Sequence, residues 1–362
     1  MREEIWLAAG YLSILVLPAA LVAGVLLHHS YLAFAVVVLI FPLVRSVVGP
    51  YLRQSPVIWH EAPATFLDRL PVLYAALLAA ATLLVIHQIA RGAANTLSAG
   101  IGMTLSLWMV MLFATCPAHD LIHRRRAADA RVGWFVAGLS GYPLLVFEHA
   151  IHHGRSGDTA RAECPRLDES VWQFAGRRIW RVLRTATSHG VGHWRPSCTQ
   201  AFKATTVTGL MLLAFTWAGG WPGFLIYAVV IVGVTFGVQL ITYLQHWGLG
   251  DDSLDDATVR QYAWEDDCLF QAWVTLNISF HQSHHGAPRL PYYRVGLLPD
   301  SPRLPAGYLV LMVVCLFPPL WRRAMLPALA HWKAEPNQPR SPGRRLTCFA
   351  LYPGRPTKPD GG

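Results

Sequence analysis

Long apolar stretches dominate this 362-residue chain, which is 53% hydrophobic and only 14% charged. A soluble domain usually carries about 25% charged residues, and a helix needs about 20 mostly apolar residues to cross a membrane. The stretches that approach this length are 5–27, 31–49, 71–90, 99–117, 204–220 and 222–244. They predict an all-α integral membrane protein with six transmembrane helices in three hairpins. The first stretch is too long for a signal peptide, and another span follows it at once.

The arginines predict which way the helices cross. With the N-terminus in the cytoplasm, the external loops are 28–30, 91–98 and 218–221, and their single basic residue is Arg91. Nearly all other basic residues then lie on the cytoplasmic side, as the positive-inside rule requires. We therefore place both termini in the cytoplasm and expect a bacterial inner membrane protein.

We expect a single domain, residues 1–335, in which a cytoplasmic helical cap follows the spans. Within the cap, the apolar stretch 133–147 is too short and too glycine-rich to span, and we expect a re-entrant or interfacial helix there. The stretch 309–319 is also too short to cross. Residues 336–362 are rich in Pro, Gly and Arg, so we expect a mobile cytoplasmic tail.

The net charge of +9 is weak evidence for nucleic-acid binding, because no nucleic-acid motif accompanies it. Anionic membrane lipid is the simpler partner for the basic residues. The six cysteines form no C-x-x-C pair, which predicts reduced thiols rather than a disulfide framework or a zinc finger.

Nine of the sixteen histidines fall in four clusters, each just beyond an apolar stretch and on the cytoplasmic side of the predicted topology. They are His119 and His123, then His149, His152 and His153, then His246, and finally His281, His284 and His285. Neutral imidazole is the commonest protein metal ligand and suits iron, zinc and copper. Nine ligands exceed what one ion can bind. The sequence therefore predicts a two-metal centre at the membrane face.

The spacing within the clusters supports this prediction. Residues four apart lie on one face of a helix, so His119 and His123 would point the same way if the fourth span continued into the cytoplasm. His149 shares a face with His152 and His153, and the last cluster repeats this H-x-x-H-H spacing. His246 stands alone, but its place at the cytoplasmic end of the sixth span makes it a candidate ligand.

Seven histidines are left out of the predicted site. His28 and His29 fall in an external loop, and the others are isolated or separated by glycines: His60, His87, His189, His193 and His331.

Other classes of protein explain the clusters less well. The string H-D-L-I-H at 119–123 is similar to the zinc-protease signature H-E-x-x-H, but its acid, Asp120, is one carbon shorter and six clustered histidines would have no role. A haem-binding electron-transfer protein would place single histidines deep inside facing spans. A transporter or metal sensor would bind one exchangeable metal without oxygen-dependent turnover.

The order H-x-x-x-H, H-x-x-H-H, lone H-x-G-L and H-x-x-H-H resembles the membrane fatty-acid desaturase and hydroxylase superfamily, in particular its alkane and xylene monooxygenases. L-Q-H-W-G-L at 244–249 is similar to the E-H-Y-G-L box of that group, and the sequence at 273–292 is similar to its final box. L-P-A-G-Y at 304–308 continues the likeness, which covers roughly residues 100–330.

Three departures from that pattern bear on the reaction. The second box is H-x-x-H-H, as in desaturases, where alkane hydroxylases usually carry H-x-x-x-H-H. Trp247 replaces the usual Tyr, and Phe280 stands where an Arg is common before the last box.

The resemblance implies a non-haem diiron centre, two iron ions held by the nine histidines, with O2 as co-substrate. The expected reaction is hydroxylation of an unactivated C–H bond in an alkane, alkyl-aromatic or fatty-acyl substrate from the bilayer. The alternative is a fatty acyl desaturase or oxidative decarboxylase with the same centre. No flavin, nicotinamide or iron–sulfur motif is present, so the resemblance implies a separate electron donor, such as rubredoxin or ferredoxin with its reductase.

Two further sets of residues are candidates for supporting roles. Asp120, Glu148 and Asn277 are candidates for orienting histidine N–H groups, and Glu265, Asp266 and Asp267 are further acids that could do so. A basic cytoplasmic surface would attract an acidic electron carrier or phospholipid headgroups; its arginines are Arg124, Arg125, Arg126, Arg177, Arg178, Arg181 and Arg184.

Overall fold

The chain is described here from a computed structural model, which covers residues 2–51, 57–155, 157–189, 196–250, 263–299, 301–334, 345–346 and 351–352. Within these ranges the secondary structure is helical apart from two isolated β-bridges and one antiparallel pair of short strands, β1 (Arg345–Leu346) and β2 (Leu351–Tyr352). The predicted all-α class is therefore confirmed. The remainder of the predicted tail, 336–362, lies outside the described residues.

The first two predicted spans are helical but change helix type along their length. The first comprises α1 (Arg2–Gly10), the 3-10 turn η1 (Tyr11–Leu15) and α2 (Val16–Leu26). The second comprises α3 (Leu32–Ala35), the π-helical turn η2 (Val36–Ile40) and α4 (Phe41–Val48). Gly49 ends the second helix at φ 74°, in the left-handed region that favours glycine.

Two uninterrupted helices follow, α5 (Glu61–Ala90) and α6 (Leu97–His123). α5 begins well before the predicted start at 71, because the polar residues Asp68 and Arg69 interrupt the apolar pattern without interrupting the helix. α6 continues beyond its apolar run to His123, which places the H-x-x-x-H histidines on one helix as predicted.

The third predicted hairpin is α10 (Pro196–His246), a helical run broken at Gly220. Gly220 has φ 58° and ψ −141°, a backbone conformation that is essentially restricted to glycine. The two arms approach closely there, since a Cβ added at Gly223 would lie 2.0 Å from the Phe215 carbonyl oxygen. The chain therefore reverses at the predicted loop 218–221.

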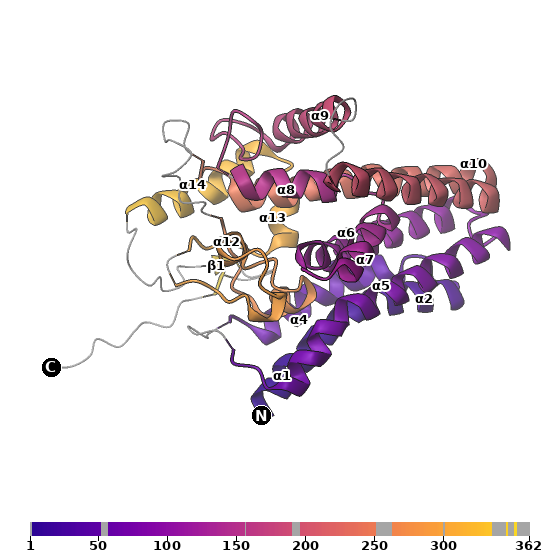
Figure 1. Cartoon of the computed structure of the whole chain (residues 1–362), viewed down its shortest axis with the longest axis horizontal. Helices are drawn as coiled ribbons and strands as arrows, with labels where there is room; N and C mark the ends of the chain where they lie inside the picture. Colours follow the sequence, from indigo (N-terminus) through magenta and orange to yellow (C-terminus); the bar gives the residue numbers. More distant parts are fainter. Residues whose placement is uncertain are drawn as a thin grey trace.

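Four helices are long and apolar enough to cross a membrane, and a shorter apolar helix accompanies them: Glu3–Leu26, Glu61–Ala90, Leu97–His123, Thr199–His246 and the shorter Leu32–Val48. In Figure 1, α2, α5, α6 and α10 run together toward one end of the molecule. Their outer sides carry bare apolar side chains, such as Leu213 at 66% exposure and Val232 at 68%. Exposed apolar surface of this kind is typical of contact with lipid, so the structure supports an integral membrane protein.

A cap of shorter helices gathers at the other end of the molecule (Figure 1). It consists of α8 (Leu145–Arg155), α9 (Val171–His189), α11 (Leu269–Val274), α12 (His281–Gly286), η3 (Tyr292–Arg294), α13 (Tyr308–Val314) and α14 (Pro318–Ala334). One more short helix, α7 (Ala127–Leu139), lies beside the long helices. The stretch 133–147, where we expected a re-entrant or interfacial helix, is divided between α7 and α8 by a turn at Gly141 (φ 83°). α7 packs against α6 and α10.

The cap has an aromatic core that holds the end of α10. Trp247 and Trp264 are fully buried, and the Trp264 indole N–H donates to the Trp247 carbonyl oxygen at 2.8 Å. The Trp321 ring from α14 meets the Trp247 ring edge-on, with centroids 5.7 Å apart. Buried aromatic pairs of this geometry stabilise a core beyond their burial alone, and here they immobilise the chain next to His246.

We expect Gly138→Ala to lower the melting temperature of the purified protein. A Cβ at Gly138 would lie 2.5 Å from the Ala204 carbonyl oxygen, so α7 and α10 would have to separate. Gly176→Ala in α9 is the matched control, because no atom lies within 4 Å of its added Cβ. There the helix propensity of Ala should stabilise by about 0.5–1 kcal/mol. Thermal unfolding in detergent would contradict this packing if both variants melted alike.

Candidate metal centre

All nine clustered histidines converge in the cap, where they form two groups. Within each group, one ligand atom of every ring lies within 4.8 Å of the others. The first group contains His119, His123, His149, His153 and His284, and the second contains His152, His246, His281 and His285. The two groups adjoin, because the ring centroids of His153 and His285 are 4.8 Å apart. The cap thus offers five and four nitrogen donors at neighbouring positions.

Each H-x-x-H-H box contributes to both groups. On α8, His149 and His153 are four apart and point into the first group, whereas His152 points into the second. On α12 the assignment is reversed: His281 and His285 belong to the second group and His284 to the first. Side chains four apart share a helix face, and the residue between them is rotated by about 100°. Each of the two boxes therefore supplies ligands to both groups, which the sequence spacing alone did not reveal.

Asp120 holds the end of α6 in place. Its Oδ1 accepts the Tyr292 backbone N–H at 3.1 Å, and its Oδ2 accepts the Arg124 Nε–H at 2.9 Å. Arg124 also donates from Nη1 to the Asp68 carbonyl oxygen at 2.6 Å. These bonds connect α6 to η3 and α5, and they fix the backbone that carries His119 and His123.

The end of α10 is held by backbone contacts around its last residue, His246. The His246 carbonyl oxygen accepts the Leu249 N–H at 3.1 Å and lies 3.2 Å from the Cys164 thiol, which donates to it. Gly248 follows at φ 74°, the left-handed position with which helices commonly end. His246 is only 1% exposed.

The turn before α12 contains two residues in the left-handed region, Leu276 at φ 49° and Asn277 at φ 57°. Three hydrogen bonds of the Asn277 side chain stabilise this conformation. Its amide donates to the Tyr292 and Val295 carbonyl oxygens, both at 2.9 Å, and its oxygen accepts the Tyr11 hydroxyl at 3.0 Å. Asn277 thus sets the direction in which the last histidine box enters the site.

The environment keeps the imidazoles neutral. Burial is the largest cause that lowers the pKa of His149, His152, His281, His284 and His285 well below the usual value, and it lowers the pKa of His153 to about 4. Neighbouring histidines lower most of these pKa values further. A histidine must be neutral to bind a metal, so the cap holds these rings in the form that metal binding requires.

The ring nitrogens face each other rather than hydrogen-bond acceptors. His153 Nε2 is 2.7 Å from His149 Nε2 and 3.0 Å from His284 Nε2. His119 Nε2 is buried and has no hydrogen-bond partner in the described part of the chain. Converging lone pairs of neutral rings repel one another unless a cation lies between them. The all-nitrogen donor set suits iron, zinc or copper, so these residues fit metal ions.

The three residues considered for orienting histidines have other hydrogen-bond partners in this structure. Asp120 and Asn277 hold backbone segments, as described above. Glu148 accepts from Arg178, at 2.6 Å from Nη2 and 2.8 Å from Nε, and from the Tyr142 hydroxyl. Glu265 likewise accepts from Arg303 at 2.9 Å and from the Ser301 hydroxyl, which joins the loop before α11 to the loop before α13.

Sequence reasoning missed Glu163, a buried acid in the loop before α9. Its Oε2 lies 3.4 Å from His152 Nδ1 and accepts from Arg178 Nη1 at 2.7 Å. No spacing or motif links Glu163 to the histidine boxes, because an irregular loop brings it there. Arg178 was predicted to lie on a basic surface, and this is wrong: its side chain is 1% exposed and ion-paired on both sides. Arg125 and Arg126 are exposed as predicted.

Among the described residues, none of the histidines left out of the site belongs to either ligand group. His60 is exposed and its Nδ1 pairs with Glu4 at 2.9 Å. His189 is the last residue of α9, and His193 lies outside the described residues.

A small cavity adjoins the first group. It is lined by His119, His123 and His284 on one side and by apolar side chains such as Leu276, Ile278 and Leu290 on the other. Its volume is about 10 Å³, enough for one water-sized molecule. A small molecule could therefore lie next to the five-nitrogen group.

Comparison with known proteins identifies the family. The family model described as fatty acid desaturase matches residues 94–314, which is more than half of the chain and includes every clustered histidine. The chain belongs to the fatty acid desaturase family.

Three curated relatives are alkane monooxygenases. Alkane 1-monooxygenase 1 of Pseudomonas aeruginosa is 28% identical over 257 residues, and the match covers 66% of each chain. Alkane 1-monooxygenase 2 of the same organism is 26% identical, over 66% of this chain and 67% of that protein. Alkane 1-monooxygenase of Pseudomonas putida is 25% identical, over 64% of this chain and 61% of that protein. The matches thus span about two thirds of the length of these relatives.

This chain differs from the usual histidine-box sequences at two single positions, Trp247 and Phe280. In the structure, both side chains have a packing role. Trp247 belongs to the aromatic core of the cap, as described above. Phe280 is 1% exposed and its ring lies 5.1 Å from the Tyr51 ring. Both substitutions place aromatic rings in hydrophobic clusters of the core.

We expect His284→Ala and His285→Ala each to reduce the metal bound by about one ion per chain. His284 belongs to the five-nitrogen group and His285 to the four-nitrogen group, so each change damages a different group. His87→Ala, at an exposed position of α5, is the control and should keep the full metal content. Elemental analysis of the purified variants measures this outcome. Equal metal content in all three variants would contradict the two-group arrangement.

Proposed function

We propose that this protein is an O2-dependent non-haem diiron membrane monooxygenase that hydroxylates an unactivated C–H bond of an alkane, alkyl-aromatic or fatty-acyl substrate. The observation that carries the proposal is the convergence of nine imidazoles in two adjoining groups at one end of a bundle of apolar helices. The desaturase family match and the relatives named alkane 1-monooxygenase support this chemistry.

The nine histidines would hold the metal ions. His119, His123, His149, His153 and His284 would hold one ion, and His152, His246, His281 and His285 would hold the other. When bound, the two irons would supply the activation of O2 with two electrons. Because every ligand in this set is neutral, the ligands leave the metal charge largely uncompensated, which favours a strongly oxidising centre.

The chain's own residues exclude water from this chemistry. Seven of the nine histidines are less than 9% exposed, and His123 and His153 are half-buried. The cavity beside the first group is bounded by Leu276, Ile278 and Leu290. A hydrophobic substrate from the bilayer would meet apolar side chains next to the metals, and competing reactions with water would be limited.

An electron donor would approach the first group. His123 and His153 are the most exposed of the nine histidines, and the exposed Arg125 and Arg126 lie two and three residues after His123. Positive charge near the exposed edge of the site would attract an acidic one-electron carrier, such as a rubredoxin or ferredoxin with its reductase.

The hydroxylase proposal is tested by product analysis with a medium-chain alkane, labelled ¹⁸O2 and a complete electron supply. We expect an alcohol that carries the label, because hydroxylation inserts one oxygen atom of O2 into the C–H bond. The control is His284→Ala, which should form no product. An alkene product without label would overturn hydroxylation.

Such an alkene would support the second candidate, a fatty acyl desaturase or oxidative decarboxylase. Two observations favour this alternative: the family model is that of fatty acid desaturases, and the second box has the shorter H-x-x-H-H spacing. An acyl substrate in the same assay distinguishes the two reactions, because only hydroxylation retains the label in the organic product.

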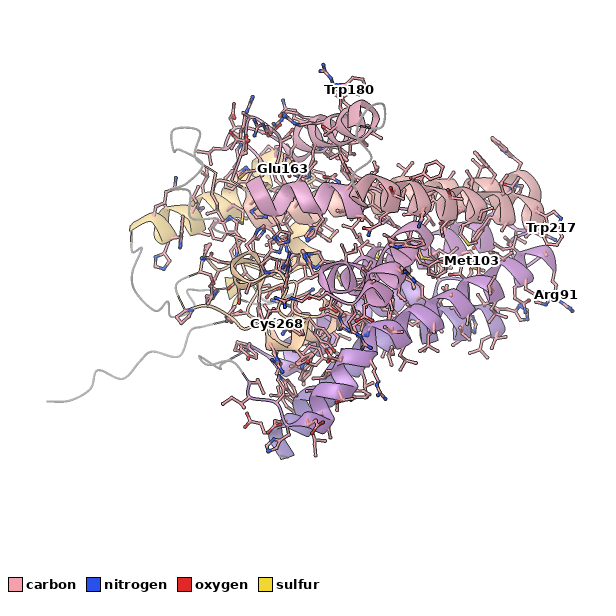
Figure 2. The ribbon with its side chains drawn as sticks, viewed as in Figure 1. Arg91, Met103, Glu163, Trp180, Trp217 and Cys268 are labelled. Carbon is pink, nitrogen blue, oxygen red and sulfur yellow. The ribbon has the colours of Figure 1, made fainter. Side chains whose placement is uncertain are left out.

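We further propose six crossings of the inner membrane, with both termini and the histidine groups in the cytoplasm. In Figure 2, Arg91 and Trp217 lie at the far end of the long helices, and Glu163 lies toward the cap. We expect a membrane-impermeant maleimide to label Arg91→Cys from the periplasmic side and Arg125→Cys only after the cells are opened. The wild type is the control, since the described cysteines Cys116, Cys164, Cys268 and Cys315 are buried. The reverse labelling pattern would contradict this orientation.

A further inference from the structure

We propose that Glu163 is a positioning residue that Arg178 holds against His152, so that it orients one ligand of the four-nitrogen group. This inference rests on the proposed metal-binding role of the histidines. Glu163 and Arg178 come from the loop before α9 and from α9 itself, neither of which carries a clustered histidine. Figure 2 labels Glu163 beside α8, the helix of the second box.

The contact with His152 has the geometry of a support for a metal ligand. His152 Nε2 belongs to the inner side of the group, where it lies 3.1 Å from His246 Nε2. A metal on Nε2 requires the ring proton to be on Nδ1, and that N–H then needs an acceptor. His152 Nδ1 makes no aligned hydrogen bond within the described structure, and the Glu163 carboxylate lies 3.4 Å from it. Rotation of the His152 ring toward Glu163 Oε2 would complete the bond.

Arg178 determines where the Glu163 carboxylate lies. Its Nη1 donates to Glu163 Oε2 at 2.7 Å and to the Ala162 carbonyl oxygen at 2.8 Å. Its Nε and Nη2 donate to Glu148, which immediately precedes His149. A planar guanidinium with several donors is suited to fixing two carboxylates at once. Arg178 therefore locks the loop that carries Glu163 to the helix that carries the second box.

The same network extends to α10. Glu148 accepts from the Tyr142 hydroxyl, and the Tyr142 oxygen accepts from Gln239 Nε2 at 2.9 Å. Gln239 and His246 are both on α10, and each is at most 1% exposed. The hydrogen bonds thus connect α9, α8 and α10, the last two of which carry ligands of the four-nitrogen group.

The charges make this support electrostatic as well as geometric. Arg178 faces two carboxylates, and the one that lies beside His152 is Glu163. A carboxylate that accepts the Nδ1–H raises the basicity of the ring and strengthens its bond to a metal. Elsewhere in the described second group, the Nδ1 atoms of His281 and His285 have no hydrogen-bond partner. His152 belongs to the four-nitrogen group alone, so the effect of Glu163 should be confined to one of the two metal positions.

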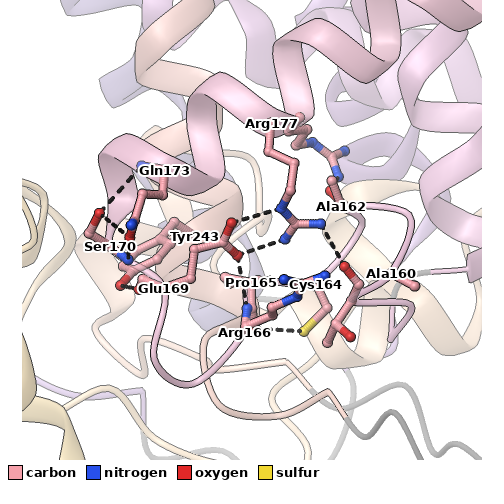
Figure 3. Close-up of polar contacts among 12 residues, drawn as sticks. Ala160, Ala162, Cys164, Pro165, Arg166, Glu169, Ser170, Gln173, Arg177 and Tyr243 are labelled. Carbon is pink, nitrogen blue, oxygen red and sulfur yellow. Dashed lines mark hydrogen bonds and ion pairs between the residues drawn. The ribbon is translucent and has the colours of Figure 1, made fainter.

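A neighbouring ion pair provides the matched control. Arg177, next to Arg178 in α9, pairs with Glu169 at 2.7 Å from Nε and 2.6 Å from Nη2. Figure 3 shows this pair and the loop around it. The hydrogen bonds of Arg177 drawn there run to Glu169 and to the surrounding loop. Glu169→Gln therefore removes a comparable ion pair without changing the contact between Glu163 and His152.

The experiment titrates the full-length protein with Co(II) in detergent against a fluorescent chelator, and records Mössbauer spectra after loading with ⁵⁷Fe. We expect Glu163→Ala to weaken Co(II) binding at one of two sites by ~10–100-fold and to change one iron signal while the other stays as in the wild type. Glu163→Gln should weaken that site less, because its amide oxygen can still accept the Nδ1–H. Glu169→Gln should match the wild type.

The near-isosteric Glu163→Gln variant keeps the test valid if Glu163→Ala does not fold, since its iron signals alone reveal a change at one site. Wild-type affinity and spectra in Glu163→Gln and Glu163→Ala would overturn the positioning role, as would an equal change at both sites. A metal-loaded wild type that inserts no oxygen into any substrate would overturn the proposed function instead, so the two failures are distinguishable.

Discussion

The repulsion among nine neutral imidazoles in a buried space is the constraint on which the rest of the cap depends. Ring nitrogens such as those of His149 and His153 lie 2.7 Å apart, an arrangement that a protein core does not adopt for packing alone. Burial keeps these rings unprotonated, because a charged imidazole would lose its hydration. The surrounding structure must therefore hold the rings together until a cation neutralises their repulsion, and the cap contains the contacts that do so.

A different type of interaction holds each segment that carries metal-ligand candidates. A carboxylate, Asp120, ties the end of α6 to two backbone segments. Buried tryptophans immobilise the end of α10, and the amide of Asn277 fixes the turn before α12. The Arg178 network supports α8. Each interaction acts on a backbone segment or a single ring, so the precision of the site comes from several independent anchors rather than from one rigid element.

Sequence patterns predicted the nine histidines that converge and the helices that carry several of them. They did not predict which histidine belongs to which of the two groups. The i, i+4 spacing predicts that His149 and His153 point together, and they do. It does not predict that His152 joins the rings of α12 and α10, because that depends on how α8 is rotated in the cap. The apolar composition of 133–147 likewise does not reveal the turn at Gly141 that divides this stretch between α7 and α8.

The amino-acid sequence by itself determined the helical membrane class, the approximate apolar segments and the identity of the clustered histidines, since hydrophobic length and short-range spacing are local properties. Only the tertiary structure decided the division into five and four nitrogens, the burial of Arg178 and the approach of Glu163 to His152. These features join segments that are distant along the chain, and the contacts between such segments are set by packing in three dimensions. The spacing of residues along the chain does not predict these contacts.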